Sequence, residues 1–242
     1  MEKIVVYATT RNMYKYLPMA IGSLLKYNPD VKVLVIAEDD YIDTINDSRI
    51  TLLNYHRLPQ WLDPQGPNYN TCWTYMALIR LFLPKLLKAD MILWLDVDTI
   101  VLSDLTPLFQ EDMTNKCIAA VIEPHLKNQE KELIRPYINT GVLLMNLKLI
   151  RELKLDDQML NIINTQKFWL PDQDVFNIVC KFRIKYLDPK WNFSPSTVRG
   201  FPLLKYLNGQ PKIIHFTVAK IWDHPYVKLW NLFYQERLGE KK

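Results

Sequence analysis

The stretch Met91-Ile92-Leu93-Trp94-Leu95-Asp96-Val97-Asp98-Thr99-Ile100-Val101 constrains the fold and the chemistry of this chain more than any other. Its first five residues are apolar and predict a buried strand, which delivers two carboxylates separated by one residue. Burying carboxylates without a counter-charge costs several kcal/mol, so a divalent cation is the simplest compensation. Hard oxygen ligands suit Mn²⁺ or Mg²⁺. We therefore predict a metal site where this strand ends.

Further short apolar runs on both sides of this strand predict additional buried strands. They lie at Ile4–Ala8, Val31–Ala37, Ile50–Leu53, Ile118–Ile122 and Gly141–Met145. Apolar residues at helical spacing follow Pro18 and recur over Thr71–Leu87. This alternation predicts an α/β fold with a Rossmann-like, mostly parallel central sheet flanked by helices. Ligands of such sheets bind beyond the carboxyl ends of the strands, where the two aspartates stand.

The composition narrows the function further. The chain has 242 residues, 49% of them hydrophobic and 23% charged, which is typical of a globular protein. Only six residues are glycine, and the chain contains no G-x-G-x-x-G, no G-x-x-x-x-G-K-[ST] and no G-x-S-x-G motif. Glycine-based dinucleotide, P-loop and hydrolase-elbow sites are therefore excluded. The chain shows no repeat and no flexible linker, so we expect a single domain over residues 1–242.

Charge and hydropathy indicate the cellular setting. The net charge of +4 lacks the dense basic patch of nucleic-acid-binding proteins, so we expect no nucleic-acid partner. Three cysteines far apart in the sequence indicate free thiols in a reducing compartment. No apolar run approaches the ~18 residues of a transmembrane helix, so we expect a cytoplasmic protein. The basic last quarter, with Val227, Trp230 and Tyr234 at helical spacing, leaves open a peripheral contact with the inner face of the membrane.

Two classes of enzyme place a D-x-D pair after a strand. Phosphatases of the haloacid-dehalogenase type use strand–D-x-D-x-[TV], and Asp96 would then be the nucleophile. These enzymes also need a later G-D-x-x-x-D, yet no glycine in this chain precedes an aspartate. The phosphatase interpretation is therefore the weaker of the two.

The other class is the nucleotide-sugar glycosyltransferases. Trp94–Val101, followed by Asp104–Phe109, closely resembles glycosyltransferase family 8, the group of glycogenin and of bacterial lipopolysaccharide galactosyl- and glucosyltransferases. Six further blocks in the same order extend the resemblance over nearly the whole chain: Val6–Thr9, Arg80–Pro84, Ile138–Leu147, Pro171–Asn177, Lys190–Phe193 and Ile213–Phe216.

The resemblance implies a GT-A-like fold and a metal-dependent hexosyltransferase that retains anomeric configuration. The donor is expected to be UDP-glucose or UDP-galactose, with Mn²⁺ as the metal and Mg²⁺ as an alternative. The acceptor would be a glycan such as a cell-envelope polysaccharide, a glycolipid or a protein. The resemblance implies a nucleotide-binding half at residues 1–100 and a sugar and acceptor half at 101–242. Oligomeric state is not indicated.

Site residues follow from the same resemblance. The expected metal ligands are Asp96, Asp98 and His215. The expected donor-binding residues are Ala8, Thr10, Asn12, Arg80, Asp96, Val97, Asp98, Asn139, Asp172, Gln173 and Lys220. Within that set, Lys220 would face the leaving diphosphate, and Asp172 and Gln173 are the catalytic candidates. Since an amide is a poor nucleophile, we favour same-face attack with Gln173 stabilising positive charge, over a covalent intermediate on Asp172 or Asp174.

Two departures from the family pattern bear on activity. Glu123 replaces the usual aspartate after the strand at 118–122, and the segment Thr217–Trp222 lacks the glycine that the family has there. The missing glycine motivates an alternative function, a catalytically degenerate glycosyltransferase that acts as a binding module. Finally, His56, His125 and His224 show no pairing with other polar residues, so we assign them structural roles.

Overall fold

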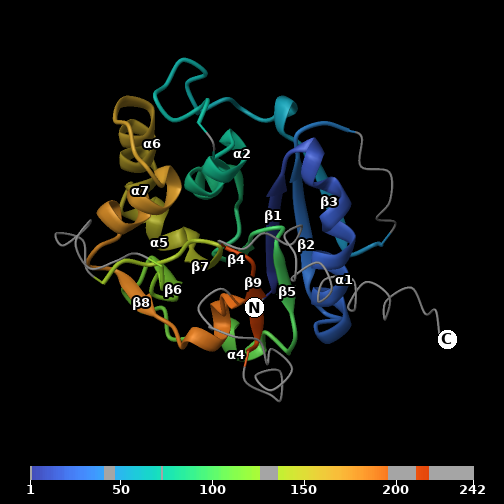
Figure 1. Cartoon of the computed structure of the whole chain (residues 1–242). Helices are drawn as coiled ribbons and strands as arrows, with labels where there is room; N and C mark the ends of the chain where they lie inside the picture. Colours follow the sequence, from blue (N-terminus) through green and yellow to red (C-terminus); the bar gives the residue numbers. More distant parts are fainter. Residues whose placement is uncertain (1, 41–46, 72, 126–135, 196–210, 218–242) are drawn as a thin grey trace.

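The strand that precedes the D-x-D pair lies at the centre of a seven-stranded sheet (Figure 1). The computed structural model describes residues 2–40, 47–71, 73–125, 136–195 and 211–217. The strand order is β3-β2-β1-β4-β7-β6-β8, and β5 and β9 form a second, two-stranded sheet. The strands are β1 (Ile4–Thr9), β2 (Lys32–Ala37), β3 (Ile50–Asn54), β4 (Met91–Leu95), β5 (Thr99–Val101), β6 (Ile118–Ala120), β7 (Val142–Asn146), β8 (Ile184–Tyr186) and β9 (Ile213–His215).

Helices connect these strands and cover both faces of the large sheet (Figure 1). The α-helices are α1 (Leu17–Tyr27), α2 (Tyr75–Leu78), α3 (Leu83–Leu86), α4 (Thr106–Phe109), α5 (Leu147–Glu152), α6 (Leu155–Thr165) and α7 (Pro171–Val179). The 3₁₀ helices are η1 (Arg11–Tyr16), η2 (Tyr55–Arg57), η3 (Ile79–Leu81) and η5 (Pro189–Asn192). Both α1 and α7 have proline in the first turn, where its fixed φ and missing N–H favour a helix start.

The sheet is mostly parallel, as predicted, but one strand runs the other way. Strands β3, β2, β1 and β4 pair in parallel, and so do β6 and β8. Strand β7 is antiparallel to both of its neighbours, β4 and β6. The run Gly141–Met145 did not reveal this, because a strand buried on both faces has the same apolar pattern in either direction.

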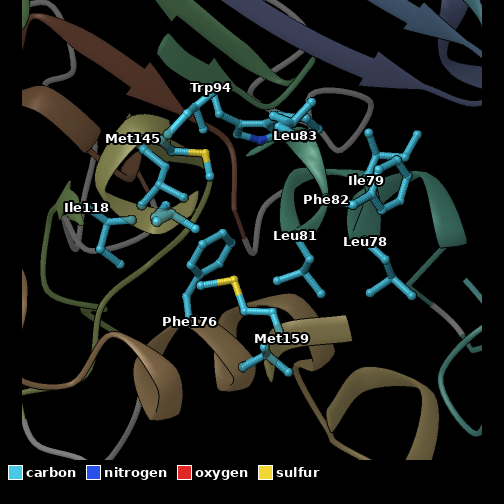
Figure 2. Close-up of a cluster of buried hydrophobic side chains, with 14 of the residues drawn as sticks. Leu78, Ile79, Leu81, Phe82, Leu83, Trp94, Ile118, Met145, Met159 and Phe176 are labelled. Atoms are coloured by element: carbon cyan, nitrogen blue, oxygen red, sulfur yellow. The ribbon is translucent and has the colours of Figure 1, made fainter. Parts of the chain in front are cut away.

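The core lies in two layers, one on each face of the sheet. Side chains alternate across β4, so that Ile92 and Trp94 join one layer while Leu93 and Leu95 join the other. The first layer is closed by α5, α6, α7 and the segment 75–86 (Figure 2). The second is closed by α1 and α4. All four of these β4 side chains are buried, so the strand is a rigid base for the polar residues that follow it.

The long helix expected over Thr71–Leu87 is instead three short pieces, α2, η3 and α3. The backbone leaves helical geometry at Phe82, where φ is −112° and ψ is 8°. Pro84 has no N–H to donate to the carbonyl of Arg80, so the helical hydrogen bonding is interrupted here and a new helix begins at Leu83. The apolar face predicted for this segment is nonetheless buried in the first core layer (Figure 2).

Some residues with predicted roles lie within the described part of the chain, and others lie outside it. Cys117 and Cys180 are buried free thiols, as predicted, whereas Cys72 lies outside the described residues. Lys220, the histidine at 224 and the aromatic stripe at 227–234 also lie outside them. In the parts of the chain that the structure describes, no helix is both long enough and apolar enough to span a bilayer.

Candidate metal and donor site

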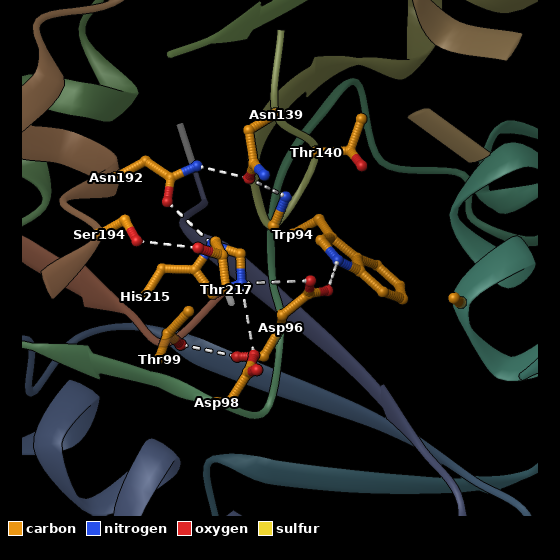
Figure 3. Close-up of polar contacts among 12 residues, drawn as sticks. Trp94, Asp96, Asp98, Thr99, Asn139, Thr140, Asn192, Ser194, His215 and Thr217 are labelled. Atoms are coloured by element: carbon orange, nitrogen blue, oxygen red, sulfur yellow. Dashed lines mark hydrogen bonds and ion pairs between the residues drawn. The ribbon is translucent and has the colours of Figure 1, made fainter. Parts of the chain in front are cut away.

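The two sheets together assemble a cluster of three metal-ligand side chains. Asp96 and Asp98 lie in the turn between β4 and β5, and His215 ends β9, which pairs antiparallel with β5. Thr99 is the register partner of His215. Each of the three side chains offers one ligand atom, and these atoms lie within 4.8 Å of one another (Figure 3). A pairing between strands more than a hundred residues apart therefore completes the site.

Asp96 is anchored through one oxygen and presents the other. Its Oδ1 accepts hydrogen bonds from Arg80 Nη2 at 2.7 Å and from Trp94 Nε1 at 2.8 Å. Its Oδ2 lies 3.6 Å from His215 Nε2, and Oδ1 of Asp98 lies 3.4 Å from the same nitrogen (Figure 3). Carboxylates held in this way lose little freedom when they bind a cation.

A chain of hydrogen bonds sets the orientation of His215. The Glu123 carboxylate can only accept, so the Asn139 amide nitrogen must face it, at 2.7 Å. The Asn139 oxygen then accepts from Asn192 Nδ2 at 2.8 Å, which turns the Asn192 oxygen toward His215 Nδ1 at 2.9 Å. As a metal ligand the ring would therefore carry its proton on Nδ1 and direct the lone pair of Nε2 toward Asp96 and Asp98.

The charges around the cluster favour a cation. A cavity of about 290 Å³ adjoins it and is lined by four carboxylates, those of Asp96, Asp98, Glu123 and Asp172, and by one guanidinium, that of Arg80. Asp98 and His215 are almost completely buried. Two carboxylate oxygens and one imidazole nitrogen suit Mn²⁺ or Mg²⁺ and leave coordination positions for phosphate oxygens. The donor set therefore fits the predicted metal.

Gly141 allows the imidazole to approach the backbone before β7. Its carbonyl accepts from the Asp96 main-chain N–H at 2.8 Å, and its own N–H donates to Asn139 Oδ1 at 2.9 Å. A Cβ on this residue would lie 1.9 Å from His215 Cε1, far inside van der Waals contact. Because β7 is antiparallel to β4, its first residues lie beside the last residues of β4, which places residues 139–141 at the cluster.

Arg80 is a buried organising residue in this structure. Its guanidinium lies 2.7 Å from Asp96 and 3.2 Å from Asp172, and it also donates to the Thr140 carbonyl at 2.7 Å. The same group lies over the Trp94 ring, 4.4 Å from its centroid. Arg80 therefore forms ion pairs with both Asp96 and Asp172, and these pairs join the D-x-D turn to α7.

The other predicted residues divide between two adjoining cavities. Ala8, Thr10, Asn12 and Val97 line a cavity of about 320 Å³ beyond the ends of β1 and β4. Asn139, Asp172, Gln173 and His215 line the cavity described above. Arg80, Asp96 and Asp98 line both. The structure thus brings together every predicted site residue that it describes; Lys220 lies outside the described residues.

Two acidic residues in the first turn of α7 have different surroundings: Asp172 lines the cavity and Asp174 does not. Asp172 lines the 290 Å³ cavity and accepts from Thr140 Oγ1 at 2.7 Å, while Gln173 Nε2 donates to Glu123 at 3.2 Å. Asp174 is not among the residues that line this cavity, and it accepts from Tyr137 Oη at 2.6 Å and from the Leu170 N–H at 3.1 Å. Burial and this bond to Asp174 raise the pKa of Tyr137 well above its usual value.

Sequence reasoning missed several residues of the site. His125, assigned a structural role, lines the cavity and lies 3.1 Å from Ser194 Oγ through Nε2. Glu123, which the sequence identifies only as a departure from the family pattern, follows the carboxyl end of β6, where ligands of such sheets bind. Asn192 belonged to a quoted block but carried no assigned role. Trp73 and Trp169 line the cavity without any recognisable motif.

The chain is similar to one known family and to several known proteins. The family described as glycosyl transferase family 8 matches residues 4–225. General stress protein A of Bacillus subtilis (strain 168) is 27% identical in an alignment of 178 positions that covers 63% of this chain and 62% of that protein. Lipopolysaccharide 1,2-glucosyltransferase of Escherichia coli (strain K12) is 32% identical in an alignment of 187 positions that covers 66% of this chain and 54% of that protein. The chain thus spans about half to three fifths of the length of these relatives.

Solved structures share the fold. The galactosyltransferase LgtC in complex with donor and acceptor sugar analogs has a TM-score of 0.71 at 22% identity, covering 97% of this chain and 95% of that one. The glycosyltransferase GlyE of Streptococcus pneumoniae TIGR4 has a TM-score of 0.73 at 21% identity, covering 98% of this chain and 60% of that one. These neighbours are GT-A glycosyltransferases, so the predicted GT-A-like α/β fold is confirmed.

Proposed function

Since the chain belongs to glycosyl transferase family 8, we propose that it transfers a hexose, glucose or galactose, from a UDP-sugar to an acceptor with retention of configuration. The observation that carries this proposal is the cluster of Asp96, Asp98 and His215 at the edge of two polar cavities. Family membership argues against the phosphatase, because the D-x-D pair is then part of a glycosyltransferase motif. The acceptor would be a glycan, a glycolipid or a protein.

The proposed cofactor is Mn²⁺, with Mg²⁺ as the alternative, held by Asp96, Asp98 and His215. When bound, the cation would neutralise charge that develops on the leaving diphosphate. The residues described above are arranged to hold it: Arg80 and Trp94 fix Asp96, while Asn192 fixes the His215 ring. Lys220 is proposed to add positive charge at the same diphosphate.

The two cavities suggest separate places for the uridine and the hexose of the donor. The one lined by Ala8, Thr10, Asn12 and Val97 is proposed to hold the uridine, because it lies beyond the carboxyl ends of β1 and β4. The one lined by Asn139, Asp172 and Gln173 is proposed to hold the hexose. Asp96, Asp98 and Arg80 line both cavities, and a diphosphate joining the two halves of the donor would lie beside them.

Gln173 and Asp172 are the proposed catalytic residues. As the bond between sugar and phosphate breaks, the sugar gains positive charge, which the polar Gln173 amide and the Asp172 carboxylate can stabilise from the cavity wall. Both are held in place: Thr140 donates to each, through its N–H to Gln173 Oε1 and through its hydroxyl to Asp172 Oδ2. The ion pair of Asp172 with Arg80 favours a charge-stabilising role over a nucleophilic one.

The purified full chain tests this proposal. It should release UDP from UDP-glucose or UDP-galactose with Mn²⁺, and EDTA should abolish the release. Asp98→Asn should reduce the rate by about 100-fold or more, because a metal ligand loses its charge. The matched control is Asp90→Asn at the opposite end of β4, where the side chain is exposed, and it should behave as wild type. Release that is equal with EDTA would contradict the metal assignment, and UDP binding without turnover would favour the binding-module alternative.

A further inference from the structure

Two tryptophans lie at the rim of the cavity that is proposed to hold the hexose, called the sugar-side cavity below. Trp169 is 77% exposed and Trp73 is 38% exposed, and both line the cavity that contains Asp172, Gln173 and His215. Single exposed apolar side chains are common on protein surfaces, so exposure alone indicates nothing. What distinguishes Trp169 is its place at the mouth of a polar cavity and the way its backbone is held.

Hydrogen bonds hold the backbone at Trp169 and at the residues on both sides of it. Three hydrogen bonds hold three consecutive residues: Phe168 N–H to Asn68 Oδ1 at 3.0 Å, Trp73 Nε1–H to the Trp169 carbonyl at 2.9 Å, and Leu170 N–H to Asp174 Oδ2 at 3.1 Å. Helix α7 begins at the next residue, Pro171. An exposed indole on such a base is preorganised, because ligand binding need not order the loop that carries it.

The position of Trp169 separates it from the proposed nucleotide subsite. Trp73 lines both cavities and so stands between them, whereas Trp169 lines only the sugar-side one. Glu123 and His125 share this distribution with Trp169. A donor would fill the nucleotide cavity and the space beside the metal cluster, with its hexose against Asn139, Asp172 and Gln173. Trp169, Glu123 and His125 have no part in that proposed donor site, so they remain for a second ligand in the same cavity.

We infer that Trp169, supported by Trp73, is the stacking platform of an acceptor subsite for a pyranose. The inference rests on the proposed function, since only a transferase needs an acceptor. A pyranose has a face of C–H groups that packs on the electron-rich face of an indole, and hydroxyls at its edge that need polar partners. Glu123 and His125, which line the same cavity, supply such partners. An acyl chain there would leave the carboxylate of Glu123 desolvated.

Binding of simple glycosides to the full chain, with Mn²⁺ and UDP present, tests the platform without turnover. The probes are methyl α- and β-D-glucopyranoside and methyl α- and β-D-galactopyranoside, followed by saturation-transfer NMR titration. Trp169→Ala should weaken the binding about five- to tenfold, and Trp169→Phe should restore most of it because a ring remains. The matched control is Phe182→Ala beyond the other end of α7, where the ring is 88% exposed and lines neither cavity; it should bind as wild type.

Three results would overturn the inference: no saturation transfer to any of the glycosides in the wild type, unchanged affinity in Trp169→Ala, or equal losses in Trp169→Ala and Phe182→Ala. Thermal unfolding of each variant separates loss of binding from loss of fold, and an exposed ring should leave the unfolding temperature unchanged. Failure of the proposed function is visible separately, as absence of UDP release from both UDP-sugars by the wild type.

Discussion

Replacing Gly141 by alanine should displace His215, a proposed metal ligand, without changing its side chain. The added Cβ would lie 1.9 Å from His215 Cε1, 2.5 Å from Nδ1 and 2.7 Å from Nε2. The backbone of residue 141 cannot retreat freely, because its carbonyl bonds to the Asp96 N–H and its N–H bonds to Asn139. The imidazole therefore has to move, although it is buried and bonded to Asn192.

The size of the shift follows from the contact distance. To reach an ordinary contact of 3.4 Å, the ring must retreat by about 1.5 Å, whereas metal–ligand distances tolerate about 0.2 Å. We expect Gly141→Ala to weaken Mn²⁺ binding by about 10- to 100-fold, as disturbed ligand geometry does elsewhere. Overpacking should also lower the free energy of unfolding by about 1–3 kcal/mol, or the melting temperature by roughly 3–10 °C. Isothermal titration with Mn²⁺ and thermal unfolding of the metal-free protein measure these effects.

A double-mutant cycle attributes the effect to the imidazole. His215→Ala alone should abolish tight Mn²⁺ binding, and adding Gly141→Ala to it should cost little further stability, because the clashing ring is gone. The two stability changes should therefore be strongly non-additive. Unchanged Mn²⁺ affinity and melting temperature in Gly141→Ala, or additive losses in the double mutant, would refute the reasoning.

Two further predictions concern the polar network and the core. Asn192→Ala should weaken Mn²⁺ binding about tenfold, because His215 loses the acceptor that fixes its tautomer; an unchanged affinity in calorimetry would contradict this. Burial raises the pKa of Tyr7 and Tyr137, so above about pH 10 the unfolded chain binds fewer protons than the folded one and stability must fall as pH rises. Each tyrosine contributes a slope of about 1.4 kcal/mol per pH unit, and urea unfolding between pH 9 and 11 should show a shallower decline for Tyr137→Phe. An identical decline in the variant would show that Tyr137 does not contribute.

Much of the architecture could be predicted from local pattern. The apolar runs that became β1, β2, β3 and β4 were predicted to within a residue or so. For β1, β2 and β4 the reason is that a largely buried strand has a nearly continuous apolar run. The strand predicted at 118–122 is shorter in the structure. β6 ends at Ala120, and Ile122 forms only an isolated bridge to Ile138. The helix at 71–87 was the clearest error, because apolar spacing continues through the break near Phe82 and Pro84.

Some residues of the candidate site could be predicted from the sequence, and others could not. The D-x-D pair was visible because a short, strongly apolar strand leads directly into two carboxylates. Glu123, His125 and Trp169 were not given roles, because each belongs to a loop whose partners lie far along the chain. Spacing within a loop carries no information about which distant segment it faces, and only the packed structure places these residues at one cavity.

The sequence alone determined that a central strand of a mostly parallel α/β sheet would end in a pair of carboxylates, for which a cation was predicted. The tertiary structure decided what completes that pair. Pairing of β5 with β9 brings His215 to Asp96 and Asp98, and the antiparallel direction of β7 brings Gly141 against the imidazole. The physical reason is that hydrophobic burial fixes which segments are strands, but a buried strand is equally apolar in either direction and beside any partner. Direction and pairing are settled only when the whole sheet packs.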